Sequence, residues 1–172
     1  NGGKSWTLVH DFEGDKIISV KVSPRDPNRI FVSHKHNGSN WKIHRTDDGG
    51  DNWQNISLSM SESDFNSNKA IYLDVDGINP DRVYALLLGT QDGYQIFNSQ
   101  DAGNTWQNLT TATLNDEHVV SLAHQRGTNG GVYLGTTRAV YYREDSMNDW
   151  ELFNSGLPLI TPAIFLQSDY CG

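Results

Sequence analysis

The hydrophobic positions of this chain form short runs of β-branched and aromatic residues, separated by clusters of Asn, Asp, Gly and Pro. Such runs are typical of β-strands and the turns between them. The predicted strands form four sets of three: residues 17–22, 71–75 and 119–123; 29–33, 82–88 and 132–135; 41–45, 94–98 and 139–143; and 53–56, 106–109 and 150–153. The same order of four strands therefore recurs three times.

A recurring octad separates the third and fourth strands of the first two units. Residues 46–53 read TDDGGDNW and residues 99–106 read SQDAGNTW, and each octad continues as Gln-Asn followed by Ile or Leu. Residues 1–6 match the end of this pattern, and residues 143–150 are a degenerate copy that keeps Asp145 and Trp150. The tryptophans at 6, 53, 106 and 150 are spaced by 47, 53 and 44 residues, a period typical of propeller blades.

A second element recurs ahead of each octad. Residues 26–31 read DPNRIF, residues 79–84 read NPDRVY, and residues 129–134 read the weaker NGGVYL. Each predicts a turn that leads into a strand, and four short strands per unit make one blade. We therefore expect an all-β fold: a partial β-propeller of about three four-stranded antiparallel blades plus the end of a preceding one.

The expected fragment of one propeller domain covers the whole chain. Its parts are a blade end at 1–10, blades at 11–60, 61–112 and 113–157, and the start of a further strand at 158–172.

The residue types of the octad suit a structural role in a tight turn. Carboxylates can accept hydrogen bonds from backbone N–H groups of their own turn, hydroxyls can cap neighbouring groups, and glycine tolerates positive φ. The tryptophan ring can then be buried between neighbouring sheets. We assign this role, and no catalytic one, to Thr46, Asp48, Gly50, Trp53, Ser99, Asp101, Gly103, Thr105 and Trp106.

The two complete octads resemble the Asp-box, or BNR, repeat of sialidases, xyloglucan-hydrolysing tandem propellers, sortilin-type luminal domains and a plastid photosystem assembly factor. The elements at 26–31 and 79–84 are most similar to sortilin-type and xyloglucanase-type blades, which also occur in large secreted bacterial surface proteins. Such families close with about six to ten blades. The resemblance implies that the remaining blades of the propeller lie outside this chain.

Composition excludes several classes of partner. The 13 Lys and Arg residues are scattered among 21 Asp and Glu residues, giving a net charge of −8, so neither nucleic acid nor an anionic membrane surface is an expected partner. The longest apolar stretch, 157–166, is interrupted by Pro158, Thr161 and Pro162, which argues against membrane insertion. The single cysteine, Cys171, excludes an internal disulfide, and its pairing with a distant cysteine stays open.

Candidate hydrolytic chemistry would require a pair of carboxylates on either side of a sugar. Asp74 and Asp76 alternate with Val75 and so point to one face, but a solvated edge explains them as well. The sialidase Arg-Ile-Pro motif is absent, because Asn28-Arg29-Ile30-Phe31 only echoes it. The acids outside the octads that we consider are Glu62, Asp64, Asp74, Asp76 and Asp116.

No cofactor is expected. Residues 74–77 read DVDG, which resembles the start of a calcium loop but lacks the later acidic ligands, so calcium on this loop or on acidic turns is the minor alternative. His34 and His36 lie on one face of a predicted strand, but no third ligand is identifiable and no metal site is predicted.

Three aromatic residues outside the octads are candidates for stacking on a ligand: Trp41, Tyr94 and Tyr142. The alternative is that each packs between blades. Glycosylation sequons begin at Asn37, Asn55 and Asn108 and matter only if the source glycosylates secreted proteins.

The leading functional hypothesis is a non-catalytic segment of a secreted or cell-surface β-propeller that binds a glycan or a protein. The first alternative is part of a glycoside hydrolase, xyloglucanase-like or sialidase-like, whose catalytic residues lie mostly outside this chain. The second is a scaffold or a client of a secretion system.

Overall fold

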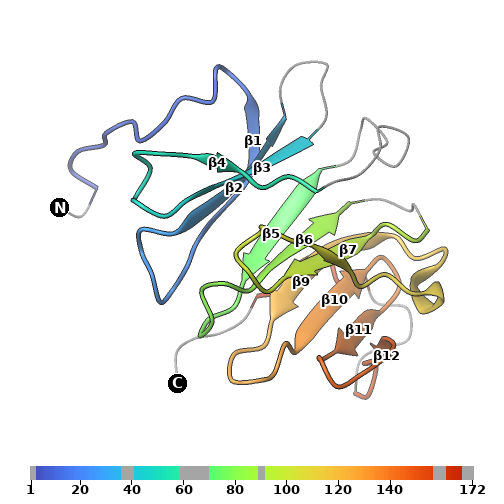
Figure 1. Cartoon of the computed structure of the whole chain (residues 1–172). Coiled ribbons are helices and arrows are strands. Elements are labelled where there is room, and N and C mark those ends of the chain that lie inside the picture. Colours follow the sequence, from blue (N-terminus) through green and yellow to red (C-terminus); the bar gives the residue numbers. More distant parts are fainter. Residues whose placement is uncertain (1–2, 36–40, 59–69, 89–91, 157–161, 168–172) are drawn as a thin grey trace.

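The computed structural model describes residues 3–35, 41–58, 70–88, 92–156 and 162–167. In these ranges the chain forms three antiparallel sheets of four strands each and a single 3₁₀ turn at Ala112–Leu114 (Figure 1). The predicted all-β fold of three four-stranded units is therefore confirmed. The division of the chain at residues 10, 60, 112 and 157 stays a prediction.

Each sheet is a meander in chain order. The first contains β1 (Lys16–Val22), β2 (Ile30–Lys35), β3 (Trp41–Thr46) and β4 (Gln54–Asn55). The second contains β5 (Ile71–Val75), β6 (Val83–Leu87), β7 (Ile96–Ser99) and β8 (Gln107–Asn108). The third contains β9 (Val119–His124), β10 (Val132–Thr136), β11 (Val140–Arg143) and β12 (Glu151–Leu152).

The fourth strand of each sheet differs from its prediction because it begins one residue after the tryptophan and pairs over only two residues. Trp53 still belongs to the preceding turn, since its indole N–H donates to the Gly50 carbonyl at 3.0 Å. Trp53 therefore closes its octad turn, whereas the indole N–H groups of Trp106 and Trp150 donate to the carbonyls of Ile56 and Leu109, which follow the preceding sheet. In all three units the tryptophan lies outside the strand.

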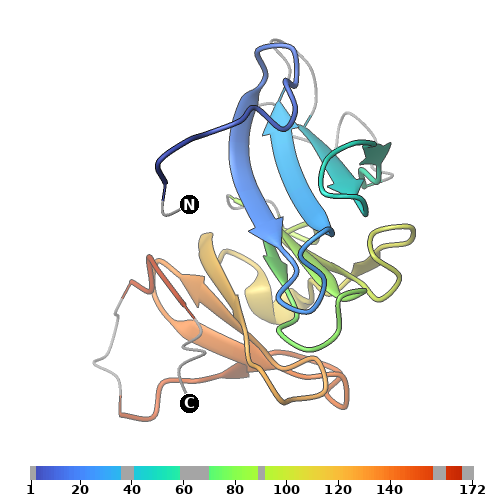
Figure 2. The ribbon, with the colours of Figure 1, turned by 90° about the vertical axis from the view of Figure 1, so that its left-hand side faces the viewer.

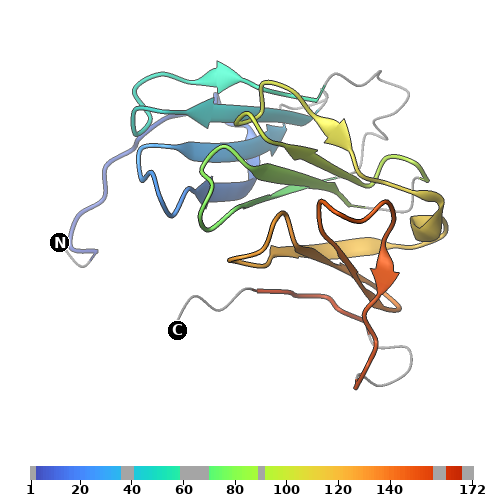
Figure 3. The same ribbon diagram turned by 60° about the horizontal axis from the view of Figure 1, so that its bottom comes forward.

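The middle sheet is buried on both faces, as Figure 3 shows by its place between the other two. All five residues of β6 are buried, and they alternate between two cores. Val83, Ala85 and Leu87 pack with the first sheet, whereas Tyr84 and Leu86 pack with the third. A continuous apolar run in a short strand is the sequence signature of such two-sided burial.

The sheets meet mainly through their first strands, since β1 and β2 contact β5, and β5 and β6 contact β9. We call the edge formed by β1, β5 and β9 the inner edge. Residues 162–167 lie against the inner-edge strand of the third sheet. The Ala163 N–H donates to the Thr136 carbonyl at 3.0 Å, and Ser121 Oγ donates to the Ala163 carbonyl at 2.5 Å.

The two outward faces of the stack expose large apolar side chains. Figure 2 shows residues 3–15 running along the side of the first sheet that faces away from the second. Trp6 is 90% exposed there, and Phe165 is 76% exposed at the other end of the stack. The exposed apolar residues of the two ends are Trp6, Leu8, Val9, Ile17, Val20 and Val22 at one end, and Phe153, Ile164 and Phe165 at the other.

Replacement of Trp150 tests the contribution of the packing between the second and third sheets. Its side chain is 3% exposed, and its indole N–H donates to the Leu109 carbonyl at 2.9 Å. We expect Trp150→Ala to lower the free energy of unfolding by about 3–5 kcal/mol in chemical denaturation. The neighbouring exposed Glu151 is the control, since Glu151→Ala should change it by no more than about 0.5 kcal/mol. Equal effects of the two variants would contradict this packing role.

Candidate functional site

The two octad turns, residues 46–53 and 99–106, are closed by the same hydrogen bonds. Thr46 Oγ1 donates to Asp48 Oδ1 at 2.7 Å, and that oxygen accepts the Asn52 N–H at 2.9 Å. In the second turn Ser99 Oγ donates to Asp101 Oδ1 at 2.7 Å, which accepts the Thr105 N–H at 2.8 Å. Both carboxylates are therefore occupied inside their own turns.

These hydrogen bonds also act on the acidity of the two carboxyl groups. The Thr46 hydroxyl, followed by the Asn52 backbone and side chain, lowers the pKa of Asp48 well below its usual range. The Thr105 hydroxyl, its backbone N–H and the Ser99 hydroxyl lower the pKa of Asp101 to about 2. A general acid must hold a proton near neutral pH, so neither group suits that role.

The glycine of each octad lies against a side chain from the preceding segment. A Cβ added to Gly50 would lie 2.1 Å from Val9 Cγ1, and one added to Gly103 would lie 2.3 Å from Ile56 Cδ1. Both glycines also have positive φ, 111° and 92° respectively. The position therefore requires glycine for two reasons, and only the backbone requirement could be read from the sequence.

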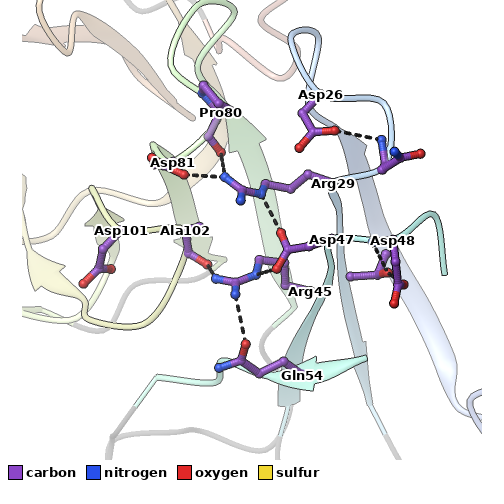
Figure 4. Close-up of polar contacts among 12 residues, drawn as sticks. Asp26, Arg29, Arg45, Asp47, Asp48, Gln54, Pro80, Asp81, Asp101 and Ala102 are labelled. Carbon is purple, nitrogen blue, oxygen red and sulfur yellow. Dashed lines mark hydrogen bonds and ion pairs between the residues drawn. The ribbon is translucent and has the colours of Figure 1, made fainter. Parts of the chain in front are cut away.

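Arginine side chains join neighbouring sheets at the level of these turns (Figure 4). Arg29, which follows β1, contacts Asp47 of its own sheet at 2.6 Å and Asp81 of the second sheet. Arg82, at the same repeat position in the second sheet, contacts Asp145 of the third at 2.7 Å. The arginine of the recurring Asn/Asp-Arg turn is therefore a cation that joins neighbouring sheets.

Asp74 of β5 and Asp76, which follows this strand, form a second polar cluster at the inner edge. Asp74 is 8% exposed; it lies 3.0 Å from Lys21 Nζ and accepts the backbone N–H of His124 at 2.8 Å. Asp76 accepts the N–H groups of Ile78 and Asn79 at 2.7 and 3.1 Å, which closes its own turn.

His124 lies between these two acids and is completely buried. Its Nε2 is 3.2 Å from Asp76 Oδ2, although the geometry is not that of a hydrogen bond. Burial lowers the pKa of His124, against the opposing effect of Asp76 and Asp74. A neutral imidazole stacked on Tyr84, with ring centroids 5.9 Å apart, fits this environment.

A hollow of about 290 Å³ opens beside Asp74 at the inner edge. Its lining combines Lys21, Asp74 and Gln167 with the apolar side chains of Leu122, Phe165 and Leu166. A second hollow, which shares Ala123, Leu166 and Gln167 with the first, extends past His124 and Tyr133. The inner edge therefore offers charged, amide and aromatic groups side by side.

The first sheet carries a histidine chain that the sequence did not predict. His34 Nδ1 lies 2.6 Å from Asp15 Oδ2, and His34 Nε2 lies 2.7 Å from His44 Nδ1. Sequence spacing suggested His36 as the neighbour of His34, but His36 lies outside the described residues. The cross-strand pairing of Val32 with His44 is what places His44 near His34, and it depends on the register of β2 and β3.

The three aromatic residues predicted to stack on a ligand pack against protein side chains. Trp41 is 7% exposed within the core between the first two sheets, Tyr94 packs against the same core, and the Tyr142 ring contacts Tyr133 at 4.9 Å. All three rings therefore contact protein. Asp116 is exposed with φ of 62° and lies in a turn.

Several predicted sites fall beyond the described ranges: Glu62, Asp64, His36, the sequon at Asn37, and Cys171. Asn55 and Asn108 are exposed; Asn55 Oδ1 accepts from Ser57, and Asn108 Nδ2 donates to the Gly93 carbonyl. Within the described ranges, no three His, Cys, Asp or Glu side chains are grouped to hold a metal ion, and no helix is long and apolar enough to cross a membrane.

Comparison with known proteins indicates the type of fold. No family model matches the chain. A xyloglucanase of Paenibacillus sp. is 26% identical over 142 residues, which are 73% of this chain and 13% of that protein. The chain therefore spans about an eighth of the length of this curated relative.

Solved structures resemble the chain at lower identity. An ancestral GH74 enzyme matches with a TM-score of 0.71 and 19% identity, over 94% of this chain and 23% of that one. YCF48 from Cyanidioschyzon merolae matches with a TM-score of 0.59 and 15% identity, over 86% of this chain and 39% of that one. These likenesses show propeller-type blades, as the repeated strands predicted.

Gly103→Ala tests the tight contact beneath the second octad turn. The new Cβ combines unfavourable φ with a clash against Ile56, so we expect a loss of about 2–5 kcal/mol in unfolding free energy. Gly93 is the matched control, because its φ is 80° and a Cβ there meets nothing within 4 Å. Gly93→Ala should cost only about 1–2 kcal/mol. A loss for Gly103→Ala no greater than that of the control would argue against the contact.

The histidine chain predicts acid sensitivity. Burial, and then the charge of His34, lowers the pKa of His44 to about 4. In the unfolded chain this histidine binds a proton near pH 6.5. The contribution of neutral His44 to the free energy of unfolding is therefore fully present above that pH and is lost as the pH falls towards 4.

The free energy of unfolding, measured with urea, should decrease between pH 7 and pH 4.5. We expect this decrease to be smaller in His44→Gln by about 1–2 kcal/mol, a value that allows for solvent screening. Exposed His118 is the control, and His118→Gln should leave the pH profile unchanged. An unaltered pH profile for His44→Gln would refute the assignment.

Proposed function

We propose that this chain is a ligand-binding sector of an extracellular β-propeller, and that it binds a polysaccharide at the inner edge without cleaving it. The observation that carries the proposal is that both carboxylates at the inner edge are engaged by protein groups. Asp74 is held by Lys21 and by the His124 N–H, and Asp76 is held by its own turn and lies against His124.

A glycoside hydrolase needs two carboxyl groups facing a sugar, one of them able to give up a proton. Asp76 is 5% exposed, and both its oxygens lie against protein groups. The remaining described acids near the turns, such as Asp48 and Asp101, are occupied by hydroxyl and backbone donors. These features favour binding over turnover in this sector.

The hollow beside Asp74 has a lining suited to a sugar. Lys21 and Gln167 can exchange hydrogen bonds with hydroxyl groups, and the exposed ring of Phe165 offers an apolar face. The named activity of the Paenibacillus relative, a xyloglucanase, supports a plant-type β-glucan as the first ligand to test. The same relative supports secretion, as expected for a protein that meets such a polymer.

The alternative function is one sector of a hydrolase whose carboxylates come from blades beyond this chain. The same relative and the ancestral GH74 structure favour this alternative. The two functions differ in what they predict for product release, so one experiment separates them.

The test uses the full-length protein with soluble xyloglucan, measured by affinity electrophoresis and by release of reducing ends. We expect retardation without release, and a three- to tenfold weaker retention for Lys21→Ala and Phe165→Ala, since each removes a group that lines the hollow. Phe153→Ala is the matched control, because Phe153 is 46% exposed and lies outside the hollow. Any release of reducing ends by the unmodified protein would overturn the proposal. Release that Asp74→Asn leaves intact would favour the alternative, in which the carboxylates come from other blades.

A further inference from the structure

A further cavity, with a polar lining, lies away from the inner edge, between the second and third sheets. Its volume is about 140 Å³. The polar side chains that line it come from β7, from the second octad turn, from β8 and from the degenerate octad at 143–150: Asn98, Gln100, Gln107, Arg143, Glu144 and Asp145.

Asn98 faces this cavity with an unused hydrogen-bonding group. The side chain is 2% exposed, and its Oδ1 has no partner among the described residues. A buried acceptor without a donor costs free energy, so the position favours a bound group that donates hydrogen bonds. Leu109 and Val132 close the rest of the wall.

The repeat shows what occupies the corresponding space between the first and second sheets. Arg45 pairs with Phe31 and Gln54 in the first sheet, as Asn98 pairs with Tyr84 and Gln107 in the second. Arg45 and Asn98 therefore hold the same position, on the face turned towards the next sheet.

Arg45 fills its space with a guanidinium group (Figure 4). Its Nη1 donates to the Ala102 carbonyl of the second sheet at 2.6 Å, its Nη2 to Gln54 Oε1 at 2.9 Å, and its Nε to Asp47 Oδ2 at 2.9 Å. The guanidinium group therefore has acceptors on both sides of the interface.

The cavity also offers side-chain amide and carboxylate acceptors, but it has Asn98 where the first interface has Arg45. Gln107 stands at the repeat position of Gln54, and Gln100 stands at that of Asp47. The neighbouring cations are already engaged, since Arg82 contacts Asp145 and Arg143 Nη1 donates to the Leu109 carbonyl at 3.0 Å. The short Asn98 side chain leaves its own Oδ1 as an additional acceptor.

We infer that this cavity binds a guanidinium group, which takes the place that Arg45 fills between the first two sheets. A planar cation with several N–H donors matches amide and carboxylate acceptors spread around one plane. The source of the group is either a free small cation or the arginine side chain of another segment.

The test measures binding of methylguanidinium to the full-length protein by saturation-transfer NMR at constant ionic strength. We expect a dissociation constant of about 1–10 mM, the range of a single small charged group. In Asn98→Arg the protein's own guanidinium group would occupy the cavity. Asn98→Leu removes the Oδ1 acceptor and replaces Asn98 with a side chain of similar size. Each should weaken binding more than tenfold, whereas Asn115→Arg, at an exposed site away from the cavity, should leave it unchanged.

Methylurea is the neutral control of the same shape, and we expect it not to bind. Equal binding of methylurea, absence of methylguanidinium binding to the unmodified protein, or unchanged binding in Asn98→Leu would each overturn the inference. The last two outcomes do not require Asn98→Arg to fold. If N-acetyl-arginine amide binds more tightly than methylguanidinium, the source is a side chain; if it binds more weakly, the source is a free cation.

Discussion

Burial of sheet faces between neighbours is the constraint on which this structure depends. A four-stranded meander has two faces and no core of its own, so each apolar face must pack on another sheet. The middle sheet meets this condition on both sides, and β6 accordingly contains only apolar and aromatic residues. The octad glycines serve the same constraint, because Gly50 and Gly103 allow Val9 and Ile56 of the preceding segments to approach the turn.

The sequence predicted the strands well because their signals are local. Alternating apolar runs, Asn/Asp/Gly turns and a recurring octad are each read within a few residues, and together they placed all twelve strands. The length of the fourth strands was missed, since the end of pairing depends on the partner strand and on a tryptophan that stays in the turn. Propensity carries no information on either point.

The polar clusters were predictable only in part. The alternation of Asp74 and Asp76 indicated a shared face, but their burial depends on Lys21 and His124, which are about fifty residues away in the chain. The chain from Asp15 through His34 to His44 required the register of β2 and β3 as well as the path of residues 3–15. Trp41 was predicted to stack on a ligand, yet its position in β3 places the ring in the core.

The pairing of Arg82 with Asp145 shows how loss of a repeat pattern can create new chemistry. Asp48 and Asp101 are retained by a hydroxyl two residues before them, whereas the same position before Asp145 is Arg143. Without that hydroxyl the Asp145 carboxylate contacts Arg82 of the preceding sheet and so joins the two sheets. A single departure from the repeat thus makes the interface between the second and third sheets chemically different from the one between the first two, because a carboxylate without a partner in its own turn is available to a neighbouring sheet.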